Sequence, residues 1–201
     1  MKALVAIVVL FMLSCDNDSS NITTFMRVFP DTLKTWAGEM TGKNFKLTRE
    51  LEQKFRLGSL LNGSKFREVR IWSLSESYET QTLFVLSELN STEWVLRRLS
   101  FNRADGDNIT NDDSRGISKP IVDSLRLYRL WTLSSQSELK DGDSYGCFDG
   151  ENLLIEIADS RKYQCLWYRC PEINQYKDSA FLIANELWSD LSGLQIQNRR
   201  R

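Results

Sequence analysis

Three consecutive segments of this chain alternate apolar and polar side chains with the two-residue period of a β-strand. They span residues 66–74, 81–89 and 93–101. Consecutive strands with short connections pair antiparallel, because a parallel pair needs a long crossover between its strands. The segments therefore predict an antiparallel meander, a sheet that can leave one face open to solvent.

Two later segments and a C-terminal helix complete the predicted fold. Residues 152–157 and 162–168 flank a polar turn and predict a hairpin. Near the C-terminus, apolar side chains recur at helical spacing, at Phe181, Ala184, Leu187 and Leu191. The predicted fold class is α+β: an antiparallel meander with helices on one face and a C-terminal amphipathic helix.

The remaining segments give weaker patterns. Residues 48–55 and 121–128 predict short helices, the first with Thr48 as its N-cap. Residues 102–120 are rich in Asp, Asn and Gly, lack the spacing of a calcium-binding loop, and predict a surface loop. Most of the six tryptophans are expected in the core, with Trp72 or Trp94 on the open face of the sheet.

The N-terminus has the physical pattern of a secretion signal. Lys2 precedes an apolar run over residues 3–13, which is too short to span a bilayer. The segment Met12-Leu13-Ser14-Cys15 resembles the lipobox of bacterial lipoproteins, with Met12 where that family prefers Leu. The resemblance implies cleavage after Ser14 and acyl chains such as palmitate on Cys15. The alternative is an ordinary signal peptide in which Cys15 has no special role.

The residues after Cys15 concern the membrane to which a lipoprotein would be sorted. Asp16-Asn17-Asp18 is similar to the acidic export signals of surface lipoproteins in Bacteroidota, whereas in enteric bacteria such an Asp resembles an inner-membrane retention signal. A flexible polar tether is the simpler interpretation. We therefore predict a signal peptide at 1–14, a tether at 15–24 and one domain at 25–201, with the outer membrane or cell surface favoured.

Composition excludes several classes of chemistry. The chain has no histidine, which removes Ser-His-Asp and Cys-His catalysis and His-ligated zinc. The formal net charge of −1 gives no electrostatic case for nucleic acid. We expect no cofactor and no metal.

Three cysteines remain once Cys15 is assigned to lipid. Cys147 and Cys170 flank the predicted hairpin, so we predict a disulfide between them in an oxidising envelope. Cys165 is then a buried thiol that packs as a small apolar side chain. A three-cysteine metal site or a reactive thiol is the alternative.

The hairpin region also carries charged residues that are candidates for an ion pair or a catalytic site. Asp149-Gly150, Glu156, Tyr163 and Arg169 resemble a pattern in uncharacterised bacterial lipoproteins, which implies a fold and no mechanism. Glu156 and Arg169 are predicted to form a structural ion pair. The alternative is that Glu68, Asp149 and Glu156 form a general acid/base set.

These observations favour a membrane-anchored envelope lipoprotein that is a non-enzymatic binding or structural module. Its partners would be the membrane, through the lipid at Cys15, and a protein or glycan whose identity the sequence does not give. A carboxylate-dependent envelope hydrolase is the competing function. The two differ in whether Glu68, Asp149 and Glu156 line one pocket or are neutralised by arginines.

Overall fold

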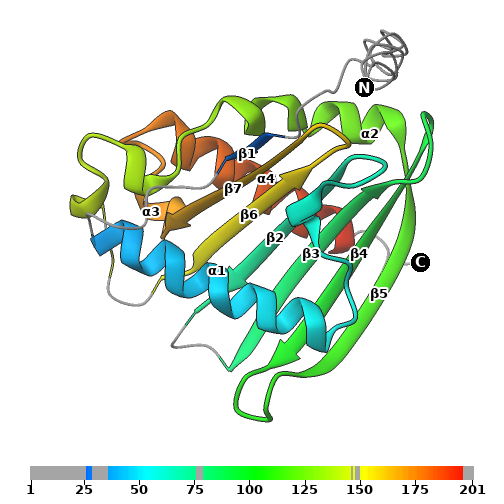
Figure 1. Cartoon of the computed structure of the whole chain (residues 1–201), viewed down its shortest axis with the longest axis horizontal. Helices are drawn as coiled ribbons and strands as arrows, with labels where there is room; N and C mark the ends of the chain where they lie inside the picture. The colour runs from blue at the N-terminus through cyan, green and yellow to red at the C-terminus, as the bar shows by residue number, and fades with distance from the viewer. Residues whose placement is uncertain (1–25, 29–35, 76–78, 146, 148–149, 197–201) are drawn as a thin grey trace, which may run out of the picture.

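One mixed seven-stranded sheet organises the protein (Figure 1). The computed structural model describes residues 26–28, 36–75, 79–145, 147 and 150–196. The strands are β1 (Met26–Val28), β2 (Glu68–Leu74), β3 (Thr80–Glu88), β4 (Glu93–Asn102), β5 (Asn108–Ser118), β6 (Asn152–Ala158) and β7 (Lys162–Arg169). Their order across the sheet is β1-β7-β6-β2-β3-β4-β5, and every neighbouring pair is antiparallel except β1 with β7.

Helices cover both faces of this sheet. The long helix α1 (Trp36–Lys54) crosses the near face in Figure 1, and α4 (Ser179–Ile196) lies behind the sheet. The short helices are α2 (Lys119–Ser124) and α3 (Pro171–Asn174), and 3-10 turns lie at 60–62, 127–132, 136–138 and 142–144. The α+β class and the C-terminal helix are confirmed, whereas the prediction that the helices share one face is wrong.

The reason is that both faces of the central strands are apolar. Ile71 and Ile155 pack with Phe181 of α4, while their strand neighbours Trp72 and Leu154 belong to the cluster under α1. Two hydrophobic cores therefore lie back to back, one on each side of the sheet. The prediction of a solvent-facing tryptophan is wrong for the same reason, because Trp72 and Trp94 are both buried.

The hairpin and the three meander strands lie close to their predicted bounds, but residues 108–118 form β5 and not a loop. This strand pairs only with β4, and nearly all its side chains are outside the core. An edge strand with little apolar burial has no alternating hydrophobic pattern to detect, and its polar side chains discourage pairing with other chains.

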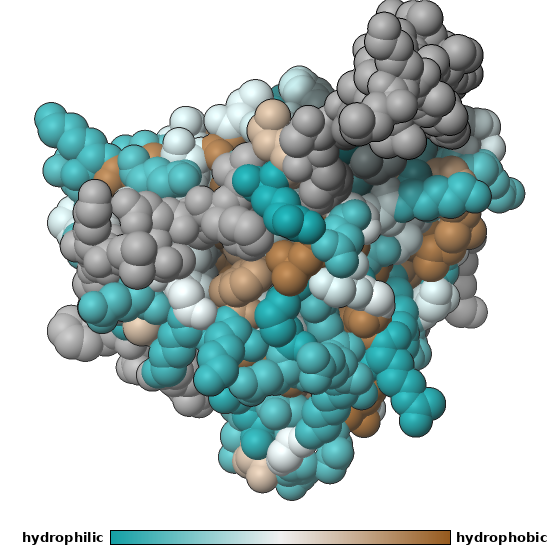
Figure 2. Space-filling model, viewed as in Figure 1, coloured by the Kyte–Doolittle hydropathy of each residue, from teal (hydrophilic) through white to brown (hydrophobic). Residues whose placement is uncertain are grey.

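Helix α1 begins at Trp36, well before the predicted cap at Thr48. The Thr48 side chain is buried inside the helix, and its hydroxyl donates to the carbonyl oxygen of Phe45 at 2.8 Å. Asp178 accepts a hydrogen bond from the backbone N–H of Ala180 at 2.7 Å, at the start of α4. On the α1 face, hydrophilic residues cover most of the described surface, and apolar ones show only in small groups (Figure 2).

Candidate functional site

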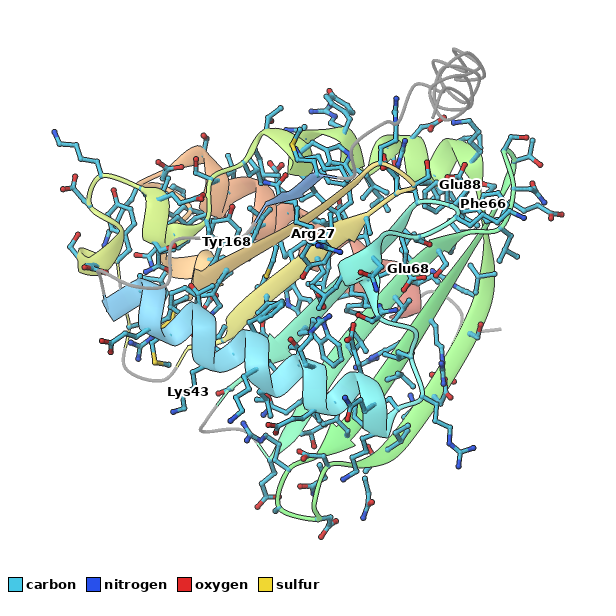
Figure 3. The ribbon with its side chains drawn as sticks, viewed as in Figure 1. Arg27, Lys43, Phe66, Glu68, Glu88 and Tyr168 are labelled. Carbon is cyan, nitrogen blue, oxygen red and sulfur yellow. A yellow bond between two sulfur atoms is a disulfide. The ribbon has the colours of Figure 1, made fainter. Side chains whose placement is uncertain are left out.

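A network of charged side chains is buried between α1 and the sheet. Arg49 of α1 pairs with Glu156 of β6 and, at 2.8 Å, with Glu52 one turn further along its own helix. Arg70 of β2 joins the same Glu52 to Glu68, with 2.7 Å between the Arg70 and Glu68 atoms. The network therefore connects one helix to two neighbouring strands. Its member at the start of β2, Glu68, is labelled in Figure 3.

Glu156 lies at one end of this network and is fully buried. Its carboxylate accepts hydrogen bonds from Trp72 Nε1 at 2.8 Å, from the hydroxyl of Tyr163 at 2.7 Å, and from Arg49. A buried carboxylate needs this degree of compensation, because an unpaired charge in a protein interior is very costly.

The prediction of an ion pair between Glu156 and Arg169 is therefore wrong, because the charge partner of Glu156 is Arg49, 107 residues away. In the β6–β7 register, Glu156 lies opposite Cys165, whereas Arg169 lies opposite Asn152 at the far end of the strand. The two side chains are on the same face but four strand positions apart, which is too far for an ion pair.

The network holds more acid than base. Two guanidinium groups meet the carboxylates of Glu52, Glu68 and Glu156. Burial, and then the charge of Glu156, raise the pKa of Glu52 to about 7 in spite of its two arginine partners. Burial, reinforced by Glu156, also raises the pKa of the Cys165 thiol, so this cysteine is a protonated core side chain and not a nucleophile.

These contacts argue against the predicted general acid/base set of Glu68, Asp149 and Glu156. Glu68 and Glu156 are both held by arginines, and neither lines the pocket described below. Asp149 lies outside the described residues. A general acid or base must come within hydrogen-bonding distance of its substrate, and Glu156 has no exposed surface from which to do so.

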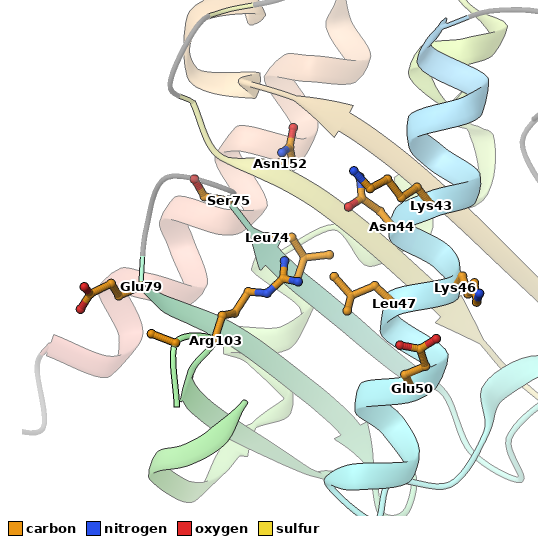
Figure 4. A pocket seen from close by; sticks show the side chains of 11 residues that line it. Lys43, Asn44, Lys46, Leu47, Glu50, Leu74, Ser75, Glu79, Arg103 and Asn152 are labelled. Carbon is orange, nitrogen blue, oxygen red and sulfur yellow. The ribbon is translucent and has the colours of Figure 1, made fainter. Parts of the chain in front are cut away.

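A pocket of about 550 Å³ opens between α1 and the ends of the central strands (Figure 4). Asn44 and Leu47 line it from α1, Leu74 from the end of β2, Asn152 from the start of β6, and Arg103 from the turn after β4. This volume lies within the range of small-ligand sites, and its walls combine apolar and polar side chains as such sites do.

One buried atom on each of two amides in the pocket wall lacks a hydrogen-bond partner. Asn44 and Asn152 are each only 8% exposed, yet Asn44 Nδ2 and Asn152 Oδ1 have no partner among the described residues. Leaving a buried polar group unsatisfied costs about 1–3 kcal/mol. Other buried atoms among the described residues, such as Ser137 Oγ and Asn174 Oδ1, also have no partner. Neither atom is accessible to solvent, so both lie within the wall of the pocket and not at the surface of the cavity.

The charged side chains Arg103 and Glu79 differ in whether they point into the pocket. In Figure 4 the Arg103 side chain extends into the space between α1 and the strands, whereas the Glu79 side chain points away from it. Arg103 Nε is 3.8 Å from Asp107 Oδ1, a long and partly exposed ion pair. Such a pair contributes little, so the guanidinium can interact with an anion in the pocket.

The cysteines away from the pocket have a structural arrangement. A disulfide joins Cys147 to Cys170, the pair predicted from the sequence, with 6.3 Å between the Cα atoms. Gly150 packs against both sulfur atoms, where any Cβ would overlap them. Cys165 is free and buried, and Cys15 lies outside the described residues.

Sequence reasoning missed the residues that build the pocket. Asn44, Arg103 and Asn152 come from three distant parts of the chain, and no spacing pattern relates them. The one available signal was weak: polar residues such as Asn44 interrupt the apolar face of α1 at positions that face the sheet.

Within the described parts of the chain, no group of three or more His, Cys, Asp or Glu side chains could hold a metal ion. No helix there is long and apolar enough to cross a bilayer. Comparisons with protein-family models, with curated proteins and with solved structures find no match.

Proposed function

We propose that this protein is a lipid-anchored lipoprotein of the bacterial envelope whose domain binds a small molecule in the pocket beneath α1. The observation that carries the binding role is the cavity of about 550 Å³, whose wall combines the apolar side chains of Leu47 and Leu74 with the guanidinium of Arg103. Small-molecule sites typically place a few polar or charged groups among apolar ones in a preformed cavity, as this lining does.

The anchoring half of the proposal rests on the first fifteen residues. An apolar run too short to span a membrane ends at Ser14-Cys15, and the resemblance to a lipobox makes Cys15 the acylated residue. Two or more acyl chains give stable membrane attachment, which a secreted binding domain needs to stay with its cell.

A non-enzymatic role fits the environment of the buried acids better than hydrolysis does. Arg49 and Tyr163 hold the Glu156 carboxylate, and Arg70 holds Glu68, so both have structural partners. The pocket volume suits one small molecule or a single sugar unit. A protein or glycan partner, expected from the sequence, stays a prediction.

Membrane fractionation tests the anchor. The wild-type protein should stay in the membrane pellet through washes with high salt and carbonate and be released by detergent. The Cys15→Ala variant should lose this resistance to washing. Equal membrane retention of the two proteins would contradict anchoring through Cys15.

Native mass spectrometry of the detergent-extracted protein tests the binding role. We expect a small-molecule adduct on the wild type that is absent from Asn44→Leu, which changes the shape and polarity of the pocket wall, and retained by Arg129→Gln. Arg129 lies outside the pocket and pairs with Glu186 on α4, so it serves as the matched control. An adduct unchanged by Asn44→Leu would place binding elsewhere.

A further inference from the structure

The chain enters the described domain at one particular end of the sheet (Figure 1). Met26, the first residue of β1, donates its backbone N–H at 2.9 Å to the carbonyl oxygen of Arg161, between β6 and β7. In the same connection, the carbonyl oxygen of Asp159 accepts at 3.1 Å from the backbone N–H of Ser64, which precedes β2. These segments therefore lie side by side, with the end of β3 next to β2. The entry surface, as we call it, consists of Met26, residues 64–67, Leu89 and residues 159–162.

Large apolar side chains are exposed on the entry surface. Phe66 is 38% exposed, Leu89 51% and Met26 56%. Phe66 and Leu89 flank neighbouring strands, and the backbone N–H of Glu88 donates at 2.9 Å to the carbonyl oxygen of Arg67 between them. Figure 3 shows Phe66 and Glu88 close together at this end of the sheet. Exposed apolar side chains that gather in one place indicate an interaction surface, whereas single scattered ones do not.

Basic side chains surround these apolar ones. The entry surface carries Lys65, Arg67, Arg161 and Lys162. Among its residues Asp159 is the one acid, and Asp159 Oδ1 accepts the backbone N–H groups of Arg161 and Lys162 at 2.7 and 2.9 Å. Of the acids next to it, Glu68 belongs to the buried network, and Glu88 accepts the backbone N–H of Arg67 at 3.3 Å. The entry surface therefore combines a net positive charge with exposed apolar groups, which favours an anionic membrane as its partner.

The length of chain before this surface limits its distance from the lipid. Ten residues separate Cys15 from Met26, and in any conformation they span at most about 40 Å. The opposite end of the sheet is a further strand length away, about 33 Å along the ten residues of β4. With acyl chains on Cys15, the entry surface is thus the part of the sheet held closest to the bilayer. Such a connection raises the effective concentration of lipid at this surface, so weak contacts suffice for docking.

We propose that the anchored domain docks its entry surface on the bilayer. Phe66 and its apolar neighbours enter the headgroup region, and the basic side chains contact anionic phospholipid headgroups. This inference rests on the anchoring half of the proposed function. It also orients the pocket, because Leu74, Arg103 and Asn152 lie at the opposite ends of their strands. A domain docked in this way opens its pocket away from the membrane.

Spin labels on the acylated protein in lipid vesicles test the docking. Ser160→Cys places a nitroxide between β6 and β7, and Asp105→Cys places one between β4 and β5 at the opposite end; both positions are exposed. The disulfide and the burial of Cys165 keep the other sulfur atoms of the domain from reacting with the label. We compare vesicles that contain phosphatidylglycerol with vesicles of phosphatidylcholine alone. In the anionic vesicles we expect a several-fold loss of accessibility to a water-soluble nickel complex at position 160 and no loss at position 105.

Charge reversal on exposed side chains connects the result to the entry surface. Lys65→Glu/Arg161→Glu reverses two of its charges, and each basic side chain near an anionic surface contributes roughly fivefold in affinity. The label at position 160 should therefore regain its accessibility to nickel in this variant. The control Lys140→Glu/Lys177→Glu makes the same change on exposed side chains near the far end of β7 and should stay docked.

Three results would overturn the docking. They are equal accessibility to nickel at positions 160 and 105 in anionic vesicles, no effect of Lys65→Glu/Arg161→Glu, and spin–spin broadening between labels at position 160, which indicates that two copies of the chain meet there. A protein that floats with the vesicles while this label stays in water keeps the anchor and loses only the docking. A protein that does not float has no lipid anchor, and this inference then fails together with the anchoring proposal.

Discussion

Removing Arg49 should destabilise the domain far more than removing an exposed arginine of the same kind. In the variant Arg49→Met, a side chain of similar length keeps the packing of the helix face but loses the charge. Glu156, which has no exposed surface, would retain only the hydrogen bonds from Trp72 and Tyr163. Breaking a buried pair by removing one partner costs about 3–5 kcal/mol.

The matched control is Arg97→Met. Arg97 pairs with Asp112 across β4 and β5, but the two side chains are 33% and 41% exposed. Exposed ion pairs contribute about 0–1 kcal/mol, so this variant should stay close to the wild type. The comparison separates the effect of burial from the effect of deleting an arginine.

A double-mutant cycle then shows whether the cost comes from the stranded charge. The variant Arg49→Met/Glu156→Gln has no buried carboxylate to compensate at this position, so it should be less destabilised than the sum of the single variants. We expect a coupling energy of about 2 kcal/mol, within the range for residues that share one network.

Urea unfolding followed by tryptophan fluorescence gives these free energies, because buried tryptophans such as Trp72 and Trp167 become exposed when the domain unfolds. The slope of the transition should stay constant across the wild type and the four variants, while the midpoint moves in those that alter the network. Equal midpoints for Arg49→Met and Arg97→Met, or purely additive effects in the cycle, would refute the claim that Arg49 neutralises Glu156.

Three further predictions follow from other parts of the structure. The pKa of Glu52 is raised from 4.5 to about 7, so the stability gained from its protonated form is complete below pH 4.5 and is lost as the pH rises through 7. In urea titrations the unfolding free energy should therefore fall by up to about 3 kcal/mol over that interval, and Glu52→Gln should flatten this pH profile. Gly142→Ala should lower the unfolding free energy by about 1–3 kcal/mol, because its Cβ would meet the carbonyl oxygen of Gln136. Gly193→Ala in α4 meets nothing within 4 Å and should raise the unfolding free energy by about 0.5–1 kcal/mol; thermal unfolding measures both. Cys147→Ser removes the disulfide to Cys170, which spans 23 residues, and should lower stability by about 3 kcal/mol; an unchanged melting temperature under non-reducing conditions would contradict a bridge in the mature protein.

The sequence predicted those strands whose pairing buries at least one face. Alternating apolar residues in β2, β3 and β4 reveal burial directly, and the hairpin of β6 and β7 has short, well-marked ends. Strand β5 escaped because it is an edge strand with polar, exposed side chains. Its hydrogen bonds to β4 have no counterpart in the pattern of hydrophobic residues.

The placement of helices on both faces was harder to foresee. Helix α1 carries Thr41, Asn44, Thr48 and Glu52 on buried positions, so its sheet-facing side does not appear apolar. These polar side chains supply part of the network and of the pocket. The residues that obscure the helix in the sequence are thus among those that give the site its chemistry.

The pocket and the network lie beyond any single-sequence argument. Arg49 meets Glu156 across 107 residues, and Asn44 and Asn152 line one pocket only after α1 packs on the sheet. The sequence suggested Arg169 as the cation for Glu156, but the strand register separates them. Local spacing predicts neighbours on one element, and it does not predict contacts made by tertiary packing.

The most direct test of the lipid-anchored account is the intact mass of the mature protein purified from the membrane fraction. We predict that the wild type begins at Cys15, lacks residues 1–14 and carries the added mass of a diacylglycerol group, with or without a further acyl chain. The Cys15→Ala variant should carry no such mass. An unmodified wild type, or a variant that keeps the added mass, would contradict anchoring at Cys15.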